Sequence, residues 1–419
     1  MAEALVPQAV IRRLGVARFI SFGGTQAAYI ALIALVYERS NGSGVWIASA
    51  LVAALGARVA ASPWAGSLGD YFDRRWVMVG SDVAAAACFV AISQVQSLPL
   101  LVALAGLAAV AEAPFGPASG GLVAMLVPDD RRGWANGTLQ SAAAAGTVLG
   151  AAVGGVLVAG LGASTAFLAN AGSFVVSAAL ASTIGGHFVS NARADADHRG
   201  VLRGMRLLAT EPVLRLSGFG IALVCLGLGM MNVAELPFFV AIGAGKVGFG
   251  IAAAAWGGGQ VAGGRLASRI VGARIERRAL ILGCAVVSIV VVLSGTIPVF
   301  ALVALLFALG GIGNTLLNVA VVLMVQRWSP VQLQSRTLAA VEALANTSIG
   351  ISLLVGGILL GPLGARGVFV LAGGLGCIAV ALALRIPRQP GPIAPDEEPA
   401  ASEAEPFDAG RTSLRPLPA

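Results

Sequence analysis

The chain has 419 residues, of which 57% are hydrophobic and only 11% are charged, and its mean hydropathy is +0.88. Soluble domains carry about 25% charged residues, so this composition excludes an ordinary soluble protein and indicates a chain embedded in a bilayer. The net charge of +7 does not predict a nucleic-acid partner, because the arginines cluster at the ends of apolar runs, as they do in membrane proteins.

Many apolar runs in the sequence are long enough to cross a bilayer, which takes roughly 20 residues. Six of them precede, and six follow, a more polar stretch from His187 to about Pro212. We therefore predict an all-α membrane protein with twelve transmembrane helices in two pseudo-symmetric six-helix bundles. The runs lie near residues 14–37, 45–67, 76–95, 98–121, 137–159, 164–185, 214–239, 248–270, 279–296, 298–325, 337–361 and 366–386.

Basic residues concentrate in alternate loops. One set of loops is rich in arginine, as at Arg74 and Arg75, whereas the other set holds only Arg39, Lys246 and Arg366. Because positively charged loops stay in the cytoplasm, we predict that both termini are cytoplasmic. The chain has one lysine among its 27 basic residues, a bias typical of GC-rich bacterial genomes, so we expect a bacterial inner or plasma membrane.

The second half of the sequence repeats the first with an offset of 202 residues, which aligns Gly356 and Gly357 with Gly154 and Gly155. Parallel repeats of this kind are typical of two-bundle transporters. We expect an interfacial helix over about 201–216, on the inner leaflet. The predicted units are an N-terminal bundle (1–186), a cytoplasmic linker with that helix (187–213), a C-terminal bundle (214–388) and a disordered cytoplasmic tail rich in proline and glutamate (389–419).

The stretch from Gly66 to Arg75, GSLGDYFDRR, forms a polar turn between the second and third runs. It resembles the signature loop of the major facilitator superfamily, although Tyr71 and Asp73 stand where a basic residue and a glycine are usual. The resemblance implies a latch in which Asp70 interacts with the start of the eleventh helix and holds the outward-facing state. A solvated turn whose arginines only set topology is the alternative. The predicted latch residues are Gly66, Asp70, Arg74, Arg75 and Arg336.

The fifth run carries glycines at one-turn spacing, a pattern that lets another helix approach closely. It resembles the antiporter motif of drug-efflux branches of the superfamily, with Ala151 where proline is usual; generic small-residue packing is the alternative. Stretches at 20–23 and 115–118 resemble the macrolide-efflux and enterobactin-exporter branch. The motif glycines are Gly146, Gly150, Gly154 and Gly155.

Arg58 and Glu112 interrupt the second and fourth runs at similar depth. Each lies 13 or 14 residues from the outer start of its run, or roughly 20 Å at 1.5 Å per residue. An ion pair between them is therefore geometrically allowed. Two interpretations stay open: a static pair that settles packing, or a Glu112 that exchanges a proton while Arg58 tunes its affinity.

Three other acidic residues lie in apolar runs. Asp82 and Glu342 join Arg58 and Glu112 as candidates for proton coupling. Asp82 lacks the arginine usual three positions later, where Ala85 stands, and Glu342 lies one turn before Asn346, so a hydrogen bond that fixes helix packing is expected there. Glu235 lies near the outer end of its run, which favours a solvated interfacial position.

Polar and aromatic residues on the first, seventh and tenth runs suit a cavity for an amphipathic ligand, since in the resembled fold these helices face the centre. Hydrogen bonding between helices is the alternative. The candidate cavity residues are Phe22, Gln26, Tyr29, Asn232, Asn314 and Asn318.

No nucleotide loop, metal cluster or nucleophile motif is evident, and the four cysteines lie in apolar runs without metal-ligand spacing. We expect no enzyme activity, cofactor or metal. The predicted function is export of a hydrophobic or amphipathic small molecule by proton antiport, with protons and membrane lipids as partners and a monomer as the working unit. Siderophore export, lysophospholipid flipping and a non-transporting membrane sensor or scaffold are the alternatives.

Overall fold

The computed structural model describes residues 5–188, 198–330 and 333–387. This part of the chain is helical and contains no strand. The first seven helices are α1 (Leu5–Arg39), α2 (Gly44–Tyr71), α3 (Arg74–Gln94), α4 (Leu98–Glu112), α5 (Phe115–Leu126), α6 (Asp129–Leu161) and α7 (Ala163–Ser182). The remaining six are α8 (His198–Thr210), α9 (Pro212–Ala241), α10 (Gly245–Ala267), α11 (Ala273–Thr296), α12 (Phe300–Trp328) and α13 (Gln334–Leu384).

The described helices make the predicted twelve membrane crossings. By length and hydropathy alone, 10 helical segments qualify as spans, and α4 and α5 form one of them together. The glycine-rich α10 is less apolar than these segments, and α13 counts once although it holds two helices. Gly364, with φ 66°, breaks the helical path inside α13, a conformation that favours glycine. Adding α10 and the second part of α13 confirms the predicted fold class.

Proline shortens two of the predicted elements. The fourth run divides because Pro114 lacks an amide hydrogen, so α4 ends at Glu112 and α5 begins at Phe115. The helix expected over 201–216 is divided in two: α8 ends at Thr210, and α9 begins at Pro212, a residue that suits the first helical position.

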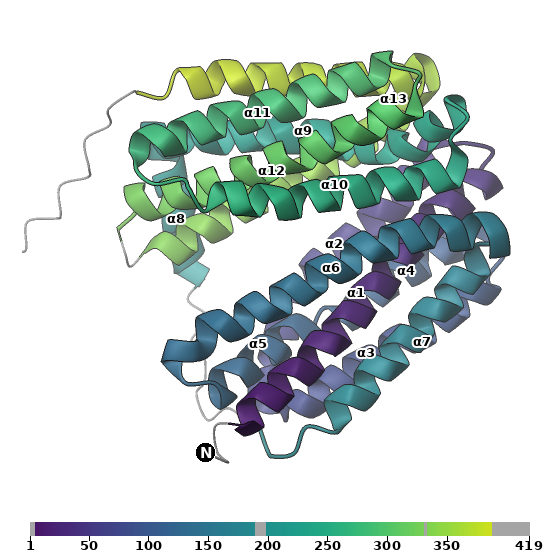
Figure 1. The fold of residues 1–419 in the computed structure, drawn as a ribbon, viewed down its shortest axis with the longest axis vertical. Helices are drawn as coiled ribbons and strands as arrows, with labels where there is room; N and C mark the ends of the chain where they lie inside the picture. Colours follow the sequence, from purple (N-terminus) through teal and green to yellow (C-terminus); the bar gives the residue numbers. More distant parts are fainter. Residues whose placement is uncertain (1–4, 189–197, 331–332, 388–419) are drawn as a thin grey trace, which may run out of the picture.

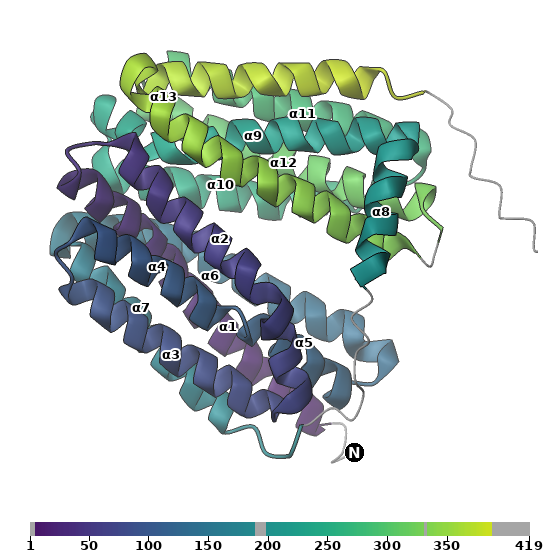
Figure 2. The same cartoon turned by 180° about the vertical axis from the view of Figure 1, so that it is seen from behind.

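The helices form two bundles, α1–α7 and α9–α13, which lie side by side in both views (Figures 1 and 2). Neighbouring aromatic rings pack inside each bundle: Phe89 stacks on Phe167 and Phe174 in the first, and Phe369 packs against Phe238 and Phe307 in the second. We call the face where α1 begins and α8 lies the basic face, and the other end of the bundles the opposite face. The bundles meet toward the opposite face and separate toward α8 (Figure 1).

Candidate functional site

The N-terminal bundle meets the C-terminal bundle at the opposite face through a glycine contact between α6 and α10. A Cβ atom placed on Gly155 would lie 3.0 Å from both the Gly250 Cα and the Lys246 carbonyl oxygen. Contacts this short leave room only for a glycine. Further toward the basic face, a hollow of about 570 Å³ lies between the two helices. It is lined by residues within 140–149 of α6 and 258–264 of α10, so the helices separate there.

A second crossing, between α13 and α2, repeats the first one. A Cβ placed on Gly357 would lie 2.7 Å from both the Gly44 carbonyl oxygen and the Ala48 Cβ. With the repeat offset of 202 residues, Gly357 corresponds to Gly155, Gly44 to Lys246, and Ala48 to Gly250. The internal repeat therefore closes the opposite face with two equivalent helix crossings.

Gly155 and Gly357 each follow another glycine, Gly154 and Gly356, and this preceding glycine packs within its own bundle. A Cβ on Gly154 would lie 2.6 Å from the Cα of Ala27 in α1, and one on Gly356 would lie 2.8 Å from the Cα of Met230 in α9. Each pair thus divides its contacts: the first glycine holds a bundle together and the second joins the two bundles. Gly146 and Gly150 complete the motif and also face α1, where any Cβ would collide with backbone.

An ion pair between the bundles lies beside the α6–α10 crossing. The Lys246 Nζ contacts the Glu38 carboxylate, and the two side chains are 27% and 50% exposed. Glu38 stands near the end of α1 and Lys246 near the start of α10, so the pair joins the first helix of one bundle to the second helix of the other. A pair this exposed contributes about 1 kcal/mol or less to stability, so the contact is weak.

A recess of about 300 Å³ enters the N-terminal bundle between α1, α2 and the α4–α5 break. Four ionisable side chains line it together with aromatic rings and small polar groups. Three of these are the predicted Arg58, Asp82 and Glu112, and the fourth is Arg18 of α1. The other lining residues are Ser21, Phe22, Thr25, Ser62, Ala65, Ala113, Phe115, Gly116, Pro117 and Phe174.

Arg58 and Glu112, which the depth argument placed at one level, form an ion pair with 3.1 Å between Nη2 and Oε2. The Arg58 side chain is 57% exposed and that of Glu112 is 16% exposed. Glu112 is the last residue of α4, immediately before the break at Pro114. The carboxylate is therefore held by one partner yet lies in a cavity, a geometry that both a packing role and a proton-exchange role allow.

Asp82 and Arg18 each keep a buried polar atom without a hydrogen-bond partner. Asp82 is 1% exposed, and its Oδ2 has no partner, although Ser177 of α7 lies beside the carboxyl group. Arg18 donates from Nη2 to the Ser119 hydroxyl at 3.2 Å, while its Nε has no partner. Among the described residues no ion pair joins Arg18 to Asp82.

Candidate cavity residues on α1 lie at or near the recess. Phe22 lines it, and Tyr29 lines a neighbouring cavity of about 100 Å³ with Arg58 and Glu112. Gln26, between them, is half-buried.

Candidates in the C-terminal bundle lie apart from the recess. Asn318 donates to the Asn314 carbonyl oxygen at 2.7 Å within α12, and Asn232 is half-buried in α9. The solvated position expected for Glu235 is wrong: the residue is 8% exposed and lies close enough to Tyr29 of α1 for electrostatic interaction. α9 lies at the contact between the bundles. The position of Glu235 along its run gives its height in the membrane but not the helix that lies beside it.

The packing role expected for Glu342 is also not supported. Glu342 and Asn346 are both exposed, and no hydrogen bond involves either side chain within the described ranges. The shared helix face was predicted correctly from their spacing, but no polar partner stands opposite it. Within the same part of the chain, no group of three His, Cys, Asp or Glu side chains could hold a metal ion.

The family model of the Major Facilitator Superfamily matches residues 14–297 and 219–418. The chain belongs to the major facilitator superfamily. A search of curated protein sequences gave no significant match.

Solved structures of other superfamily-type transporters share the fold. The nucleoside transporter NupG gives a TM-score of 0.73 at 13% identity, covering 90% of this chain and 98% of that chain. A bacterial homologue of the human lysosomal transporter Spinster, in an inward-facing and unoccupied conformation, gives 0.70 at 13% identity, covering 90% and 96%. A POT family transporter in complex with a thioalcohol-conjugated peptide gives 0.70 at 12% identity, covering 89% and 94%.

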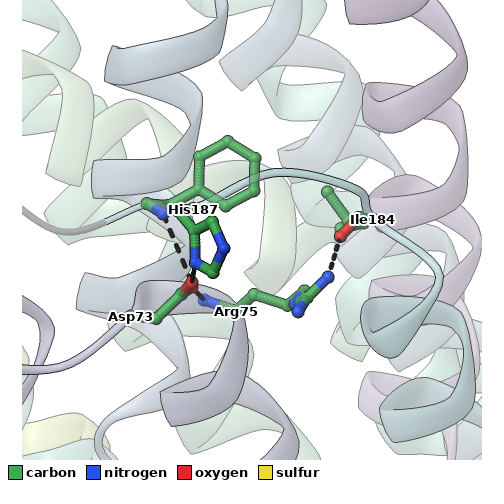
Figure 3. Close-up of polar contacts among 5 residues, drawn as sticks. Asp73, Arg75, Ile184 and His187 are labelled. Atoms are coloured by element: carbon green, nitrogen blue, oxygen red, sulfur yellow. Dashed lines mark hydrogen bonds and ion pairs between the residues drawn. The ribbon is translucent and has the colours of Figure 1, made fainter.

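The superfamily's signature loop is anchored within the N-terminal bundle (Figure 3). Asp73, which replaces the usual glycine, caps α3 by accepting from the Arg75 amide at 2.9 Å and also accepts from the Phe188 amide at 3.3 Å. His187 lies 3.6 Å from the same carboxylate. The departure from the family pattern therefore ties the chain after α7 to the α2–α3 loop.

Arg75 closes the same end of the bundle. It donates from Nη1 to the Ile184 carbonyl oxygen at 2.6 Å, and Arg277 donates to the Ile386 carbonyl oxygen at 2.7 Å. Both the donors and the acceptors differ by the repeat offset of 202 residues. In this conformation Arg75 thus binds a carbonyl group just after α7, within its own half of the fold.

Of the predicted latch residues, the structure describes the side chains of Arg74, Arg75 and Arg336 together with Gly66. A Cβ on Gly66 would meet no atom within 4 Å, so α2 is uncrowded there. The backbone of Asp70 belongs to α2, but its side chain lies outside the described part. At the start of α13, the Arg336 carbonyl oxygen is covered by Gly204 of α8.

Sequence reasoning missed two contributors to the site. Arg18 was passed over because it lies near the start of the first run, where an arginine is typical of a loop that sets topology. The pair of Glu38 with Lys246 joins residues 208 positions apart, and only the exclusion of lysine from the rest of the chain could have marked it. The predicted tail at 389–419 lies outside the described residues.

Proposed function

We propose that this protein is a secondary active transporter that exports an amphipathic small molecule in exchange for protons. The proposal assigns it to the drug-efflux side of the superfamily, as the antiporter glycine motif implies. The basic face is cytoplasmic in this proposal, following the positive-inside rule, and the membrane is the bacterial cell membrane. The protein works as a monomer, since the recess and both crossings lie within one chain.

One observation carries the proposal: the contact between the bundles is closed at one face only. The Gly155 and Gly357 crossings and the pair of Glu38 with Lys246 hold the opposite face together, while α6 and α10 separate toward the basic face. Alternating access requires this asymmetry, because the site must communicate with one side of the membrane at a time. The described conformation is then the inward-open state.

The latch fits the same cycle. An Asp70 carboxylate would meet the start of α13, where unpaired backbone amides favour an anion, only when the basic face closes. The uncrowded position of Gly66 in the inward-open state supports a latch that belongs to the other conformation.

Proton coupling is assigned to Glu112, with Arg58 as its partner. Ionisable groups inside a membrane protein mark proton relays by default, and this pair lines the recess at the α4–α5 break. A cation bound nearby would favour the ionised carboxylates and so oppose protonation. Such competition is what exchange of substrate for protons requires.

The function is tested by expression in a bacterium lacking its own efflux pumps. Cells that express the protein should accumulate less of at least one lipophilic dye in a broad panel, and a protonophore should abolish the difference. Asp70→Asn is the matched variant: it should reach the membrane at normal levels and lose export. Unchanged accumulation across the panel would favour the sensor or lipid alternatives instead.

A further inference from the structure

The recess between α1 and the α4–α5 break contains two charges of each sign but only one ion pair. Arg58 neutralises Glu112 at 3.1 Å, which leaves Arg18 and Asp82. Both line the same recess, yet neither forms an ion pair with any described residue. Each also keeps one buried polar atom, the Arg18 Nε and the Asp82 Oδ2, without a hydrogen-bond partner.

These two unmatched groups cost free energy in an empty recess. Polar groups buried without a partner lose their hydration and gain nothing in return. Ionisable side chains within membrane spans are paired with one another or mark a ligand path. Arg18 offers a donor and a positive charge, whereas Asp82 offers an acceptor and a negative charge. A molecule that offers a negatively charged acceptor to Arg18 and a positively charged donor to Asp82 would satisfy both the hydrogen bonds and the charges.

The rest of the recess is apolar and aromatic. Phe22, Phe115 and Phe174 line it beside Pro117, and Phe22 is 42% exposed. Rings of this kind suit a hydrocarbon or aromatic portion of a ligand, with a few polar groups fixing its orientation. A volume of about 300 Å³ is at the lower end of small-molecule sites.

We propose that the recess binds an amphipathic zwitterion, whose anionic group contacts Arg18, whose ammonium group contacts Asp82, and whose apolar part lies against the phenylalanines. The inference rests on the proposed transport function and names the substrate class for it. Arg18 and Asp82 act as specificity-determining residues, while the Arg58–Glu112 pair keeps its separate role. Glu112 lines the same recess, so the ammonium group would approach a second carboxylate.

A matched set of ten-carbon probes tests this class: 2-aminodecanoic acid as the zwitterion, decylamine as the cation and decanoic acid as the anion. Binding is measured by calorimetry on the full chain in phosphatidylcholine nanodiscs, with empty nanodiscs as the background. The zwitterion should bind about 10- to 100-fold more tightly than either singly charged probe, the range expected for one further charge-assisted contact.

Three variants assign the contacts. Arg18→Gln should reduce zwitterion affinity to that of decylamine and leave decylamine binding unchanged, whereas Arg18→Lys should keep most of the preference. Asp82→Asn should instead reduce it to that of decanoic acid. Arg12→Gln is the control, because Arg12 is exposed on α1 outside the recess. Equal binding of the three probes, or an equal loss in Arg12→Gln, would overturn the proposal.

The same measurements separate this inference from the transport function. Selective zwitterion binding without any dye export would retain the site and remove the exporter function. Dye export together with no zwitterion preference would retain the exporter and overturn the substrate class.

Discussion

At the scale of single residues, the recess shows how an ion pair and unpaired charges can share one cavity. In the Arg58–Glu112 pair the arginine is 57% exposed and the glutamate 16% exposed, so screening at the arginine limits the contribution of the pair to stability to about 1 kcal/mol. Asp82, in contrast, is almost fully buried. An ionisable group such as Asp82 is costly inside a membrane span, so its presence there indicates a function.

Glu112→Gln separates the two interpretations of that pair. Glutamine stays neutral at every pH, so transport rates that change with pH in the parent protein should become independent of pH in the variant. The melting temperature should shift little, because Arg58, the partner left without its carboxylate, is 57% exposed. Both quantities are measured on purified protein, the first in proteoliposomes, with exposed Glu342→Gln as the control. A variant that keeps the pH profile and loses stability would show that the pair only settles packing.

The depth of a residue could be predicted from the sequence, but its lateral surroundings could not. Equal spacing from the outer ends of two runs placed Arg58 opposite Glu112, and the structure brings them to 3.1 Å. The same count misjudged Glu235, since it gives height in the membrane and not the neighbouring helix. The position of Arg18 near the start of the first run marked it only as a topology signal, and its contact with Ser119 of α5 could not be read from one helix.

At the scale of helices, the repeated glycine pairs explain how one motif serves two interfaces. Gly154 and Gly356 pack within their bundles, while Gly155 and Gly357 pack between bundles. Adjacent residues on a helix point about 100° apart, so a pair can face two neighbours at once. The motif glycines could be found from the sequence, whereas this division of contacts required the packed structure.

Gly155→Val should weaken the closed state of the opposite face without unfolding the bundle. The added side chain collides with the α10 backbone, and overpacking of this kind costs about 1–3 kcal/mol, which corresponds to roughly a 5- to 150-fold shift between states. Lys246 is the only lysine, so a membrane-impermeant amine reagent followed by peptide mass spectrometry reports its exposure. Labelling of Lys246 should rise.

Gly160→Val is the matched control, because Gly160 lies on the same helix and a Cβ there meets nothing within 4 Å. An equal rise in Lys246 labelling in this control, or no rise in Gly155→Val, would contradict the assignment of Gly155 to the closure.

At the scale of the whole molecule, the two halves also share equivalent contacts far from the glycines. Arg75 and Arg277 donate to the carbonyl groups of Ile184 and Ile386, so the same hydrogen bond holds the segment after the last helix of each half. The twelve crossings and the pseudo-symmetry could be predicted because hydropathy and sequence offset are local properties. Which face is closed could not, since it depends on contacts between halves that are about 200 residues apart.

The central claim is that two bundles move against each other around contacts that close one face at a time. Pulsed electron spin resonance tests it on a cysteine-replaced chain with labels at both ends of α6 and α10: Trp134 with Ser268 at the basic face, and Leu161 with Val247 at the opposite face. When substrate or a pH gradient shifts the conformation, the first distance should shorten while the second lengthens. Two distances that stay constant, or that change in the same direction, would contradict the account.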